Sequence, residues 1–175
     1  MASCKLAIFE RQPIDVEAEL RRAYAICQET GVTFAGPWVL GMLASLTDNP
    51  ETREWALREG QRVLSEQICV SHNYIYFYRY AMDASISARL WTEAERYALE
   101  LEEYTRPEPL PVCDFFIARA RALSDLERRQ RDGVLVVELR RLADEAKRMG
   151  LNSDLPAIRE ALDAARESRI AADLC

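Results

Sequence analysis

Apolar side chains recur every three or four residues along most of the chain, which is the period of one face of an α-helix. No stretch keeps the alternation of apolar and polar residues that marks a half-buried strand. The pattern therefore predicts an all-α fold of about seven to eight helices. Two of the clearest helical faces consist of Val16, Leu20, Ala23 and Cys27, and of Leu135, Leu139, Leu142, Ala146 and Met149.

Capping residues and a proline bound the first two helices. Asp15 suits an N-cap and Gly31 a C-terminal stop, so the first helix is expected to span 15–30. Pro37 suits the first turn of a second helix, 36–47, because the N–H that proline lacks would have no partner there.

The third helix follows Asn49 and Pro50, a cap followed by a proline, and is expected to reach Ile68. It contains Gly60, although glycine is less favourable than alanine in a helix by about 1 kcal/mol. We expect another helix to approach closely at this glycine.

An aromatic-rich helix stands at the centre of the pattern. Ser71 is its expected N-cap, and five of its first ten residues are aromatic. Thr92 with Glu95 fits the capping-box pattern T-x-x-E, which predicts that the next helix begins there. A run of prolines at 107–111 then ends that helix.

The helices also repeat in pairs. An alanine late in each first helix recurs at Ala44, Ala84 and Ala122. This recurrence is typical of α-solenoids, and the run ARLWTEAERYALELEEY is tetratricopeptide-like. We therefore predict a single domain of helical hairpins stacked as an α-solenoid. Its parts are an N-terminal extension at 1–14 and a repeat domain at 15–175, with hairpins at 36–68, 71–106 and 111–149 and flanking helices at 15–30 and 154–172.

Charge and cysteine content argue against several classes of protein. The chain has 175 residues and a net charge of −6, whereas a nucleic-acid partner requires clustered positive charge. No apolar run reaches the roughly 18 residues of a membrane-spanning helix, so no membrane partner is expected. The five cysteines are odd in number and widely spaced, which favours reduced thiols and a cytoplasmic location.

Reactive constellations are missing from the sequence. His72 is the only histidine, so neither a multi-histidine metal site nor a histidine-activated nucleophile is expected elsewhere. The phosphate-binding pattern GxxxxGK[ST] is also missing. The sequence therefore predicts no catalytic residues, no cofactor and no metal.

Several strings in the chain carry a resemblance to a known family. They are ETGVTFAGPWVLGMLA, SHNYIYFYRYAMDASI, WTEAERYALELEEYTRPEPLPVCDFFIARARAL and RRLADEAKRMGL. Together they resemble the C-terminal helical-repeat region of bacterial adenylate/guanylate cyclase-like proteins. In that family a cyclase domain and a signalling ATPase domain precede tetratricopeptide-like repeats. The resemblance implies a regulatory, protein-binding role and carries no catalytic residue onto this chain.

One polar stripe is the best candidate for a binding surface. His72, Tyr76 and Arg79 share a helical face with Asp83, and the repeat continues this stripe on a later helix. First helices of a solenoid line its concave surface, where partners bind. The alternative is an ordinary solvated face with an internal Arg79–Asp83 ion pair. The candidate partner-binding residues are Trp38, His72, Tyr76, Arg79, Tyr80, Asp83, Asp114 and Arg121.

The sequence thus favours a non-catalytic interaction or regulatory module. Its expected partner is a protein or peptide segment, which includes other domains of the same signalling protein. A homodimer that hides an apolar end of the repeat stack is a further option. The alternative function is a small-molecule sensor, with an apolar or cationic ligand in an aromatic-lined cavity under 71–80. An enzyme ranks third.

Overall fold

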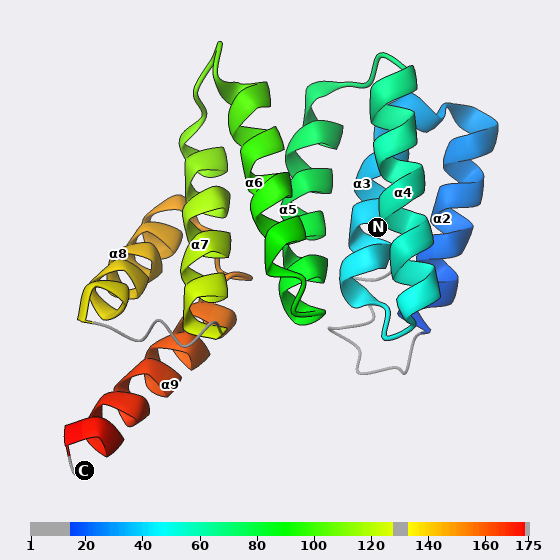
Figure 1. Ribbon diagram of the computed structural model, residues 1–175. Helices are drawn as coiled ribbons and strands as arrows, with labels where there is room; N and C mark the ends of the chain where they lie inside the picture. The colour runs from blue at the N-terminus through cyan, green and yellow to red at the C-terminus, as the bar shows by residue number, and fades with distance from the viewer. Residues whose placement is uncertain (1–14, 128–132, 174–175) are drawn as a thin grey trace. The chain divides into compact units, whose positions relative to one another are not determined.

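The computed structural model describes residues 15–127 and 133–173, and over these ranges the chain is all-helical (Figure 1). The all-α prediction is confirmed, with eight helices and no strand in the described part. The predicted extension at 1–14 lies outside the described residues. The helices are α2 Val16–Thr30, α3 Val32–Leu46, α4 Pro50–Glu66, α5 Ser71–Ser87, α6 Trp91–Thr105, α7 Pro111–Glu127, α8 Gly133–Met149 and α9 Leu155–Asp173.

The chain divides into two compact units, with the boundary between Ser87 and Ala88. The first unit contains α2 to α5 and the second contains α6 to α9. The hairpin predicted at 71–106 therefore contributes one helix to each unit. The α-solenoid stacking of the hairpins remains a prediction.

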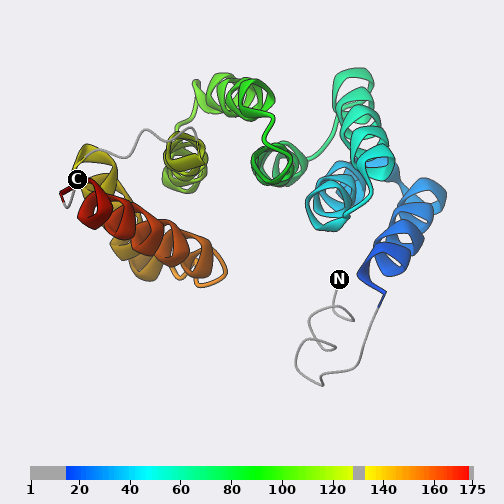
Figure 2. The same ribbon diagram turned by 60° about the horizontal axis from the view of Figure 1, so that its bottom comes forward.

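Helix α3 is the centre of the first unit. It packs against α2, α4 and α5, and Figure 2 shows α2 and α4 beside it. Its sequence, VTFAGPWVLGMLASL, contains no charged residue, as expected for a helix surrounded by others. Leu40 and Leu43 on this helix are fully buried.

Two glycines allow a close approach around Phe77 of α5. A Cβ atom built on Gly60 of α4 would lie 2.2 Å from Cε2 of the Phe77 ring. A Cβ atom on Gly41 of α3 would lie 3.1 Å from the Phe77 Cα atom. The close approach predicted at Gly60 is therefore confirmed, and the fully buried Phe77 ring fills the space beside it.

The predicted start of α3 is wrong. The helix begins at Val32, so Pro37 lies inside it and not in its first turn. Proline has no N–H for the Thr33 carbonyl, and the Asn73 side chain of α5 donates to that carbonyl at 2.8 Å instead. The Asn73 side-chain oxygen accepts the Trp38 N–H at 3.2 Å. The completely buried Asn73 side chain thus supplies hydrogen bonds to the α3 backbone where Pro37 interrupts the helical pattern.

In the second unit, helices adjacent in sequence pack against each other, and α7 also contacts α9. Figure 2 shows α8 and α9 side by side. Arg119 of α7 and Asp154, the residue before α9, form a buried ion pair with 3.3 Å between Nε and Oδ1. This pair joins α7 to the start of α9, a contact that the sequence analysis did not predict.

Two further predicted boundaries need correction. Helix α6 begins at Trp91 after Leu90, without a side-chain cap, so the capping box of Thr92 and Glu95 is wrong. Glu95 binds Arg121 of α7 instead, at 2.8 Å. Helix α4 ends at Glu66, and Ile68 lies beyond it with 97% of its surface exposed.

Three capping predictions for the first unit hold, those for Asp15, Gly31 and Asn49. The Asp15 carboxylate accepts the Ala18 N–H at 3.0 Å, and the Asn49 side chain accepts the Glu51 N–H at 2.8 Å. Gly31 ends α2 with a φ of 133°. None of the helices in the described ranges is long and apolar enough to cross a membrane.

Candidate functional site

Four aromatic side chains of the first unit form a continuous row, here called the aromatic row: Phe34 and Trp38 of α3, and His72 and Tyr76 of α5. The His72 ring meets the Phe34 and Trp38 rings edge to face, with centroids 5.6 Å apart in both contacts. The Trp38 and Tyr76 rings stack at 4.9 Å. Such contacts hold the rings as one rigid surface.

Hydrogen bonds fix the end of this row that carries Phe34. The His72 Nε2 atom lies 2.6 Å from the Phe34 carbonyl oxygen, and because a carbonyl can only accept, Nε2 carries the hydrogen. Asn73 also donates to that carbonyl, at 3.1 Å. The backbone of Phe34 is therefore anchored on α5 while 70% of the residue's surface is exposed.

Other exposed apolar side chains gather at the same end of the unit. Helices α2 and α4 end there, and α3 and α5 begin there (Figure 1). Ile26 is 51% exposed, Ile68 97% and Val70 44%, and the Val70 N–H donates to the Thr33 carbonyl next to Phe34. Several apolar side chains are thus exposed together at this end of the first unit, and such groups of apolar side chains mark interaction sites in other proteins.

The structure brings together three of the predicted site residues, Trp38, His72 and Tyr76. Two others lie further along α5, where the Arg79 guanidinium is 4.5 Å from the centroid of the Tyr80 ring. Asp83 lies nearer the end of the same helix and is half-buried. The predicted stripe on α5 therefore divides into an aromatic part, which belongs to the row, and a charged part beyond it.

Sequence reasoning missed Phe34 as a site residue. It precedes Trp38 by one helical turn, so its spacing from Trp38 was the available signal. The late helix start predicted at 36 placed Phe34 outside the helix and hid that relationship.

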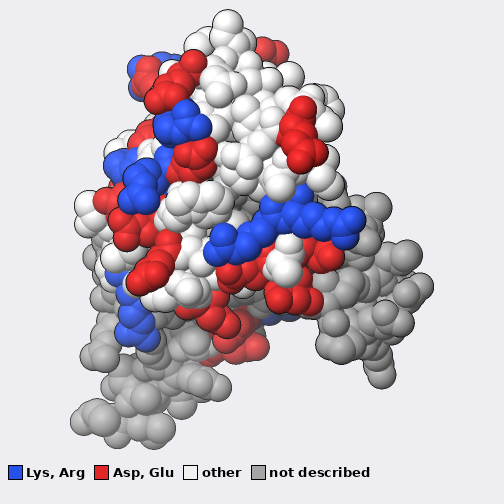
Figure 3. Space-filling view, turned by 90° about the vertical axis from the view of Figure 1, so that its right-hand side faces the viewer, with Lys and Arg blue, Asp and Glu red and all other residues white. Residues whose placement is uncertain are grey.

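A charged band on another face of the first unit is ordinary solvated surface. Figure 3 shows acidic and basic side chains gathered along α4 and over part of α2. The exposed ion pairs on α4 include those of Arg62 with Glu66 at 2.6 Å and of Arg58 with Glu54 at 3.4 Å. Exposed pairs within one helix contribute about 0.3–0.5 kcal/mol each, so this band stabilises α4 without forming a site.

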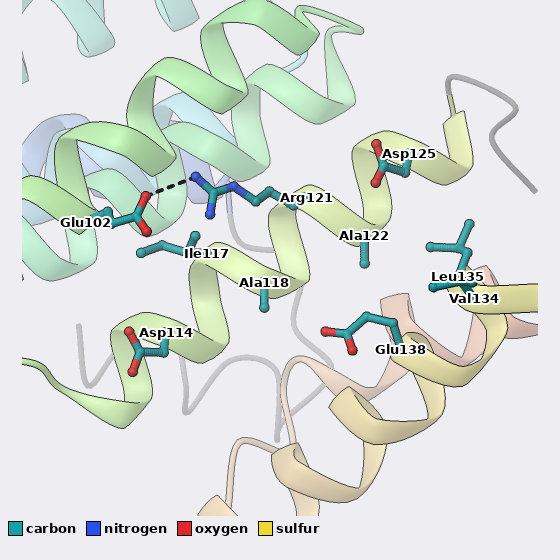
Figure 4. A pocket seen from close by; sticks show the side chains of 10 residues that line it. All are labelled: Glu102, Asp114, Ile117, Ala118, Arg121, Ala122, Asp125, Val134, Leu135 and Glu138. Atoms are coloured by element: carbon teal, nitrogen blue, oxygen red, sulfur yellow. Dashed lines mark hydrogen bonds and ion pairs between the residues drawn. The ribbon is translucent and has the colours of Figure 1, made fainter.

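The second unit contains a cavity of about 470 Å³, here called the acidic groove, between α6, α7 and α8 (Figure 4). Two of the predicted site residues, Asp114 and Arg121, line it. Its described lining carries four carboxylates and one guanidinium, and its apolar part comes from α7 and α8. The charged residues are Glu102, Asp114, Arg121, Asp125 and Glu138.

Arg121 is bound by carboxylates of α6. Its Nη2 atom lies 2.8 Å from Glu95 and 3.1 Å from Glu102. The hydrogen bond that Arg121 donates to Glu95 raises the pKa of its guanidinium, so this side chain stays charged. On α8, the hydrogen bond from Arg141 lowers the pKa of Glu138, which keeps that carboxylate ionised.

The two halves of the predicted stripe belong to different units. His72, Tyr76 and Arg79 lie in the first unit, whereas Asp114 and Arg121 lie in the second. Each half is therefore a surface of its own unit. The repeat that relates the residues of α5 to those of α7 remains a pattern of the sequence.

The cysteines in the described ranges are not activated for chemistry. Cys27, Cys69 and Cys113 are free thiols. Burial raises the pKa of Cys113 to about 11, and burial also raises the pKa of the other two. Thiols with raised pKa values are poor nucleophiles. Within residues 15–127 and 133–173, no three His, Cys, Asp or Glu side chains are placed to hold a metal ion.

Comparisons of the chain with family models, curated proteins and solved structures find no match. The geometry of the two surfaces is therefore the basis for a functional assignment.

Proposed function

We propose that the chain is a non-catalytic protein-binding module whose first unit captures a partner segment on the aromatic row. The observation that carries this proposal is the exposed Phe34 ring, held beside His72 by hydrogen bonds to its own backbone. Burial of this apolar ring against a partner is favourable, and because the ring is already held rigidly, binding costs little conformational entropy.

The composition of this surface supports a protein partner. Aromatic side chains are enriched at protein interfaces, and Trp and Tyr dominate the residues that contribute most to affinity. The aromatic row offers Trp38 and Tyr76 next to Phe34, with exposed Ile68 and Val70 at the same end of the unit. A partner segment with apolar side chains would fit this surface.

The resemblance to cyclase-like proteins supports a regulatory role. In that setting the chain would be the C-terminal repeat region of a cytoplasmic signalling protein, and the partner segment would come from a neighbouring domain of that protein. Regulation would follow if binding of the segment favours one arrangement of the domains.

Small-molecule sensing is the second candidate function. The volume of the acidic groove, about 470 Å³, falls within the range of small-molecule sites. Its carboxylates favour a cationic ligand. The aromatic-lined cavity first expected under 71–80 is a weaker candidate, because the Phe77 ring occupies the space between α4 and α5.

A matched pair of variants tests the protein-binding proposal. Phe34→Ala removes the exposed ring at the start of α3, and Leu46→Ala removes a side chain that is 56% exposed at the end of the same helix. Both substitutions should change the free energy of unfolding by less than about 0.5 kcal/mol. Partners are first captured on the immobilised wild-type chain and identified, and each affinity is then measured by calorimetry.

We expect Phe34→Ala to lower the affinity for a captured partner by about thirtyfold, the equivalent of about 2 kcal/mol. Leu46→Ala should leave that affinity unchanged. Equal affinities for the wild type and a folded Phe34→Ala variant would refute the proposal.

A further inference from the structure

We propose that the acidic groove of the second unit binds an extended peptide segment with two basic side chains four positions apart and an apolar side chain midway between them. This site lies in the second unit, whereas the aromatic row lies in the first. It selects basic side chains, whereas the aromatic row selects apolar ones. It shares with the proposed function only the premise that the chain binds polypeptide segments.

The unpaired charges of the groove lie at its two ends. Asp114 and Asp125 form no hydrogen bond or ion pair through their side chains with any other described residue. They are 11 positions apart on α7 (125 − 114 = 11), which at a rise of about 1.5 Å per residue separates them by about 16 Å. Figure 4 shows them at opposite ends of the row of side chains that α7 presents to the groove.

The described lining of the groove offers no cation to neutralise these two carboxylates. Arg121 is the one cation among the described residues that line the groove, and Figure 4 shows it directed toward Glu102 on α6. Its hydrogen bonds to Glu95 and Glu102 keep it there. Arg121 is therefore a positioning residue that joins α7 to α6, and not an anchor for an acidic partner. A cation from outside is the complement that the groove lacks.

The floor of the groove explains why a peptide fits better than a simple cation. Ile117, Ala122 and Leu135 are 5%, 4% and 6% exposed and form the apolar floor of the groove. Ala118 contributes only a methyl group at the middle of the α7 side, so a backbone can approach closely there. From α8, Glu138 points into the groove opposite Ala118 (Figure 4).

The spacing of the two aspartates defines the ligand. An extended peptide advances about 3.3 Å per residue and directs alternate side chains to one face, so residues four positions apart face the same way about 13 Å apart. Long lysine side chains reach the remaining distance of about 3 Å to the two carboxylates. The residue midway between them points to the same face, where leucine or valine would be buried on the floor.

The same charges exclude nucleic acid as the ligand of the groove. Four carboxylates line it, and they would repel the phosphates of a nucleic-acid backbone.

Fluorescence anisotropy with labelled nine-residue peptides tests this proposal on the full chain. The test peptide carries lysines at positions 3 and 7 and a leucine at position 5. One control peptide places the lysines at adjacent positions, and a second replaces the leucine with serine. The protein variants are the double substitution Asp114→Asn with Asp125→Asn and the control Asp48→Asn with Glu54→Gln, which removes the same charge from the first unit.

We expect the groove variant to bind the test peptide about tenfold more weakly than the wild type, and the control variant to match the wild type. Both control peptides should bind at least about threefold more weakly to the wild type. Far-UV circular dichroism verifies that the variants are folded.

Equal losses in the groove and control variants would show nonspecific attraction to an acidic protein and would overturn the proposal. Equal affinity for all three peptides, or complete competition by spermine at the same concentration as the test peptide, would also overturn it and point to a small cationic ligand instead. Phe34→Ala should leave this binding unchanged, so failure of the groove is distinguishable from failure of the aromatic row.

Discussion

In the first unit three helices pack around α3, whereas in the second unit each helix packs mainly against its neighbours in sequence. The first arrangement buries α3 and places the Phe77 ring of α5 directly against Gly60 of α4. The second leaves a groove of about 470 Å³ between α6, α7 and α8. One all-helical chain thus forms a unit closed around α3 and a unit with an open, acidic groove.

The units also differ in the polar group that each buries. The first buries Asn73, a neutral amide that completes the hydrogen bonds of α3. The second buries a charged pair, Arg119 with Asp154. A buried ion can be tolerated only with its partner, while a buried amide loses only hydrogen bonds when removed. Substitutions at these positions should therefore have effects of different size.

The largest effect is expected for Arg119→Ala in the second unit. The substitution leaves the Asp154 carboxylate, which is 1% exposed, without the guanidinium that balances its charge. Loss of one partner of a buried pair costs about 3–5 kcal/mol of unfolding free energy. Urea denaturation followed by circular dichroism measures this change.

The control for this prediction is Arg148→Ala, whose side chain is 70% exposed and pairs with Glu145 on the same helix. It should cost less than about 0.5 kcal/mol. Similar midpoints of urea denaturation for the two variants would show that water reaches the Arg119–Asp154 pair in solution.

A smaller loss is expected for Asn73→Ala in the first unit. The variant removes the shortest hydrogen bond to the Thr33 carbonyl, which replaces the missing N–H of Pro37, and the side-chain acceptor of the Trp38 N–H. We expect a loss of about 2–3 kcal/mol in the same denaturation assay. Asn152→Ala, at an exposed turn residue, is the matched control and should be neutral. A neutral Asn73→Ala would mean that water reaches the interrupted turn of α3.

The sequence predicted the helices well because periodicity and capping are local signals. Asp15, Asn49 and Gly31 act as expected, since each needs only the backbone within one turn. Pro37 misled the prediction because its tolerance inside α3 depends on Asn73, which belongs to another helix. The capping box failed for a related reason, because Glu95 binds an arginine of α7.

The candidate sites were predictable only in part. The face containing His72 and Tyr76 followed from helical spacing, but the inclusion of Trp38 with Phe34 required the packing of α3 on α5. Asp114 is exposed, as a partner-binding residue must be. Arg121, predicted as a partner contact, pairs with Glu95 and Glu102 of α6. The sequence did not predict these ion pairs, because no pattern within one helix reveals a contact with the next helix.

The smallest of these effects is expected for Gly60→Ala, which tests the tight packing of the first unit directly. Alanine is normally better than glycine in a helix by about 1 kcal/mol. At Gly60 the added methyl group would lie 2.2 Å from the Phe77 ring, which is fully buried and cannot swing into solvent. We expect a net loss of about 1–2 kcal/mol in urea denaturation, because overpacking outweighs the gain in helix propensity.

Two further variants decide whether the Phe77 ring is the cause of that loss. Gly133→Ala in the second unit meets no atom within 4 Å and should be neutral or stabilising. Combining Gly60→Ala with Phe77→Leu should recover part of the loss, since contacting residues couple in a double-mutant cycle. If Gly60→Ala instead stabilises the protein as Gly133→Ala does, α4 and α5 are not in tight contact around Phe77, and the contrast between a closed first unit and an open second unit is wrong.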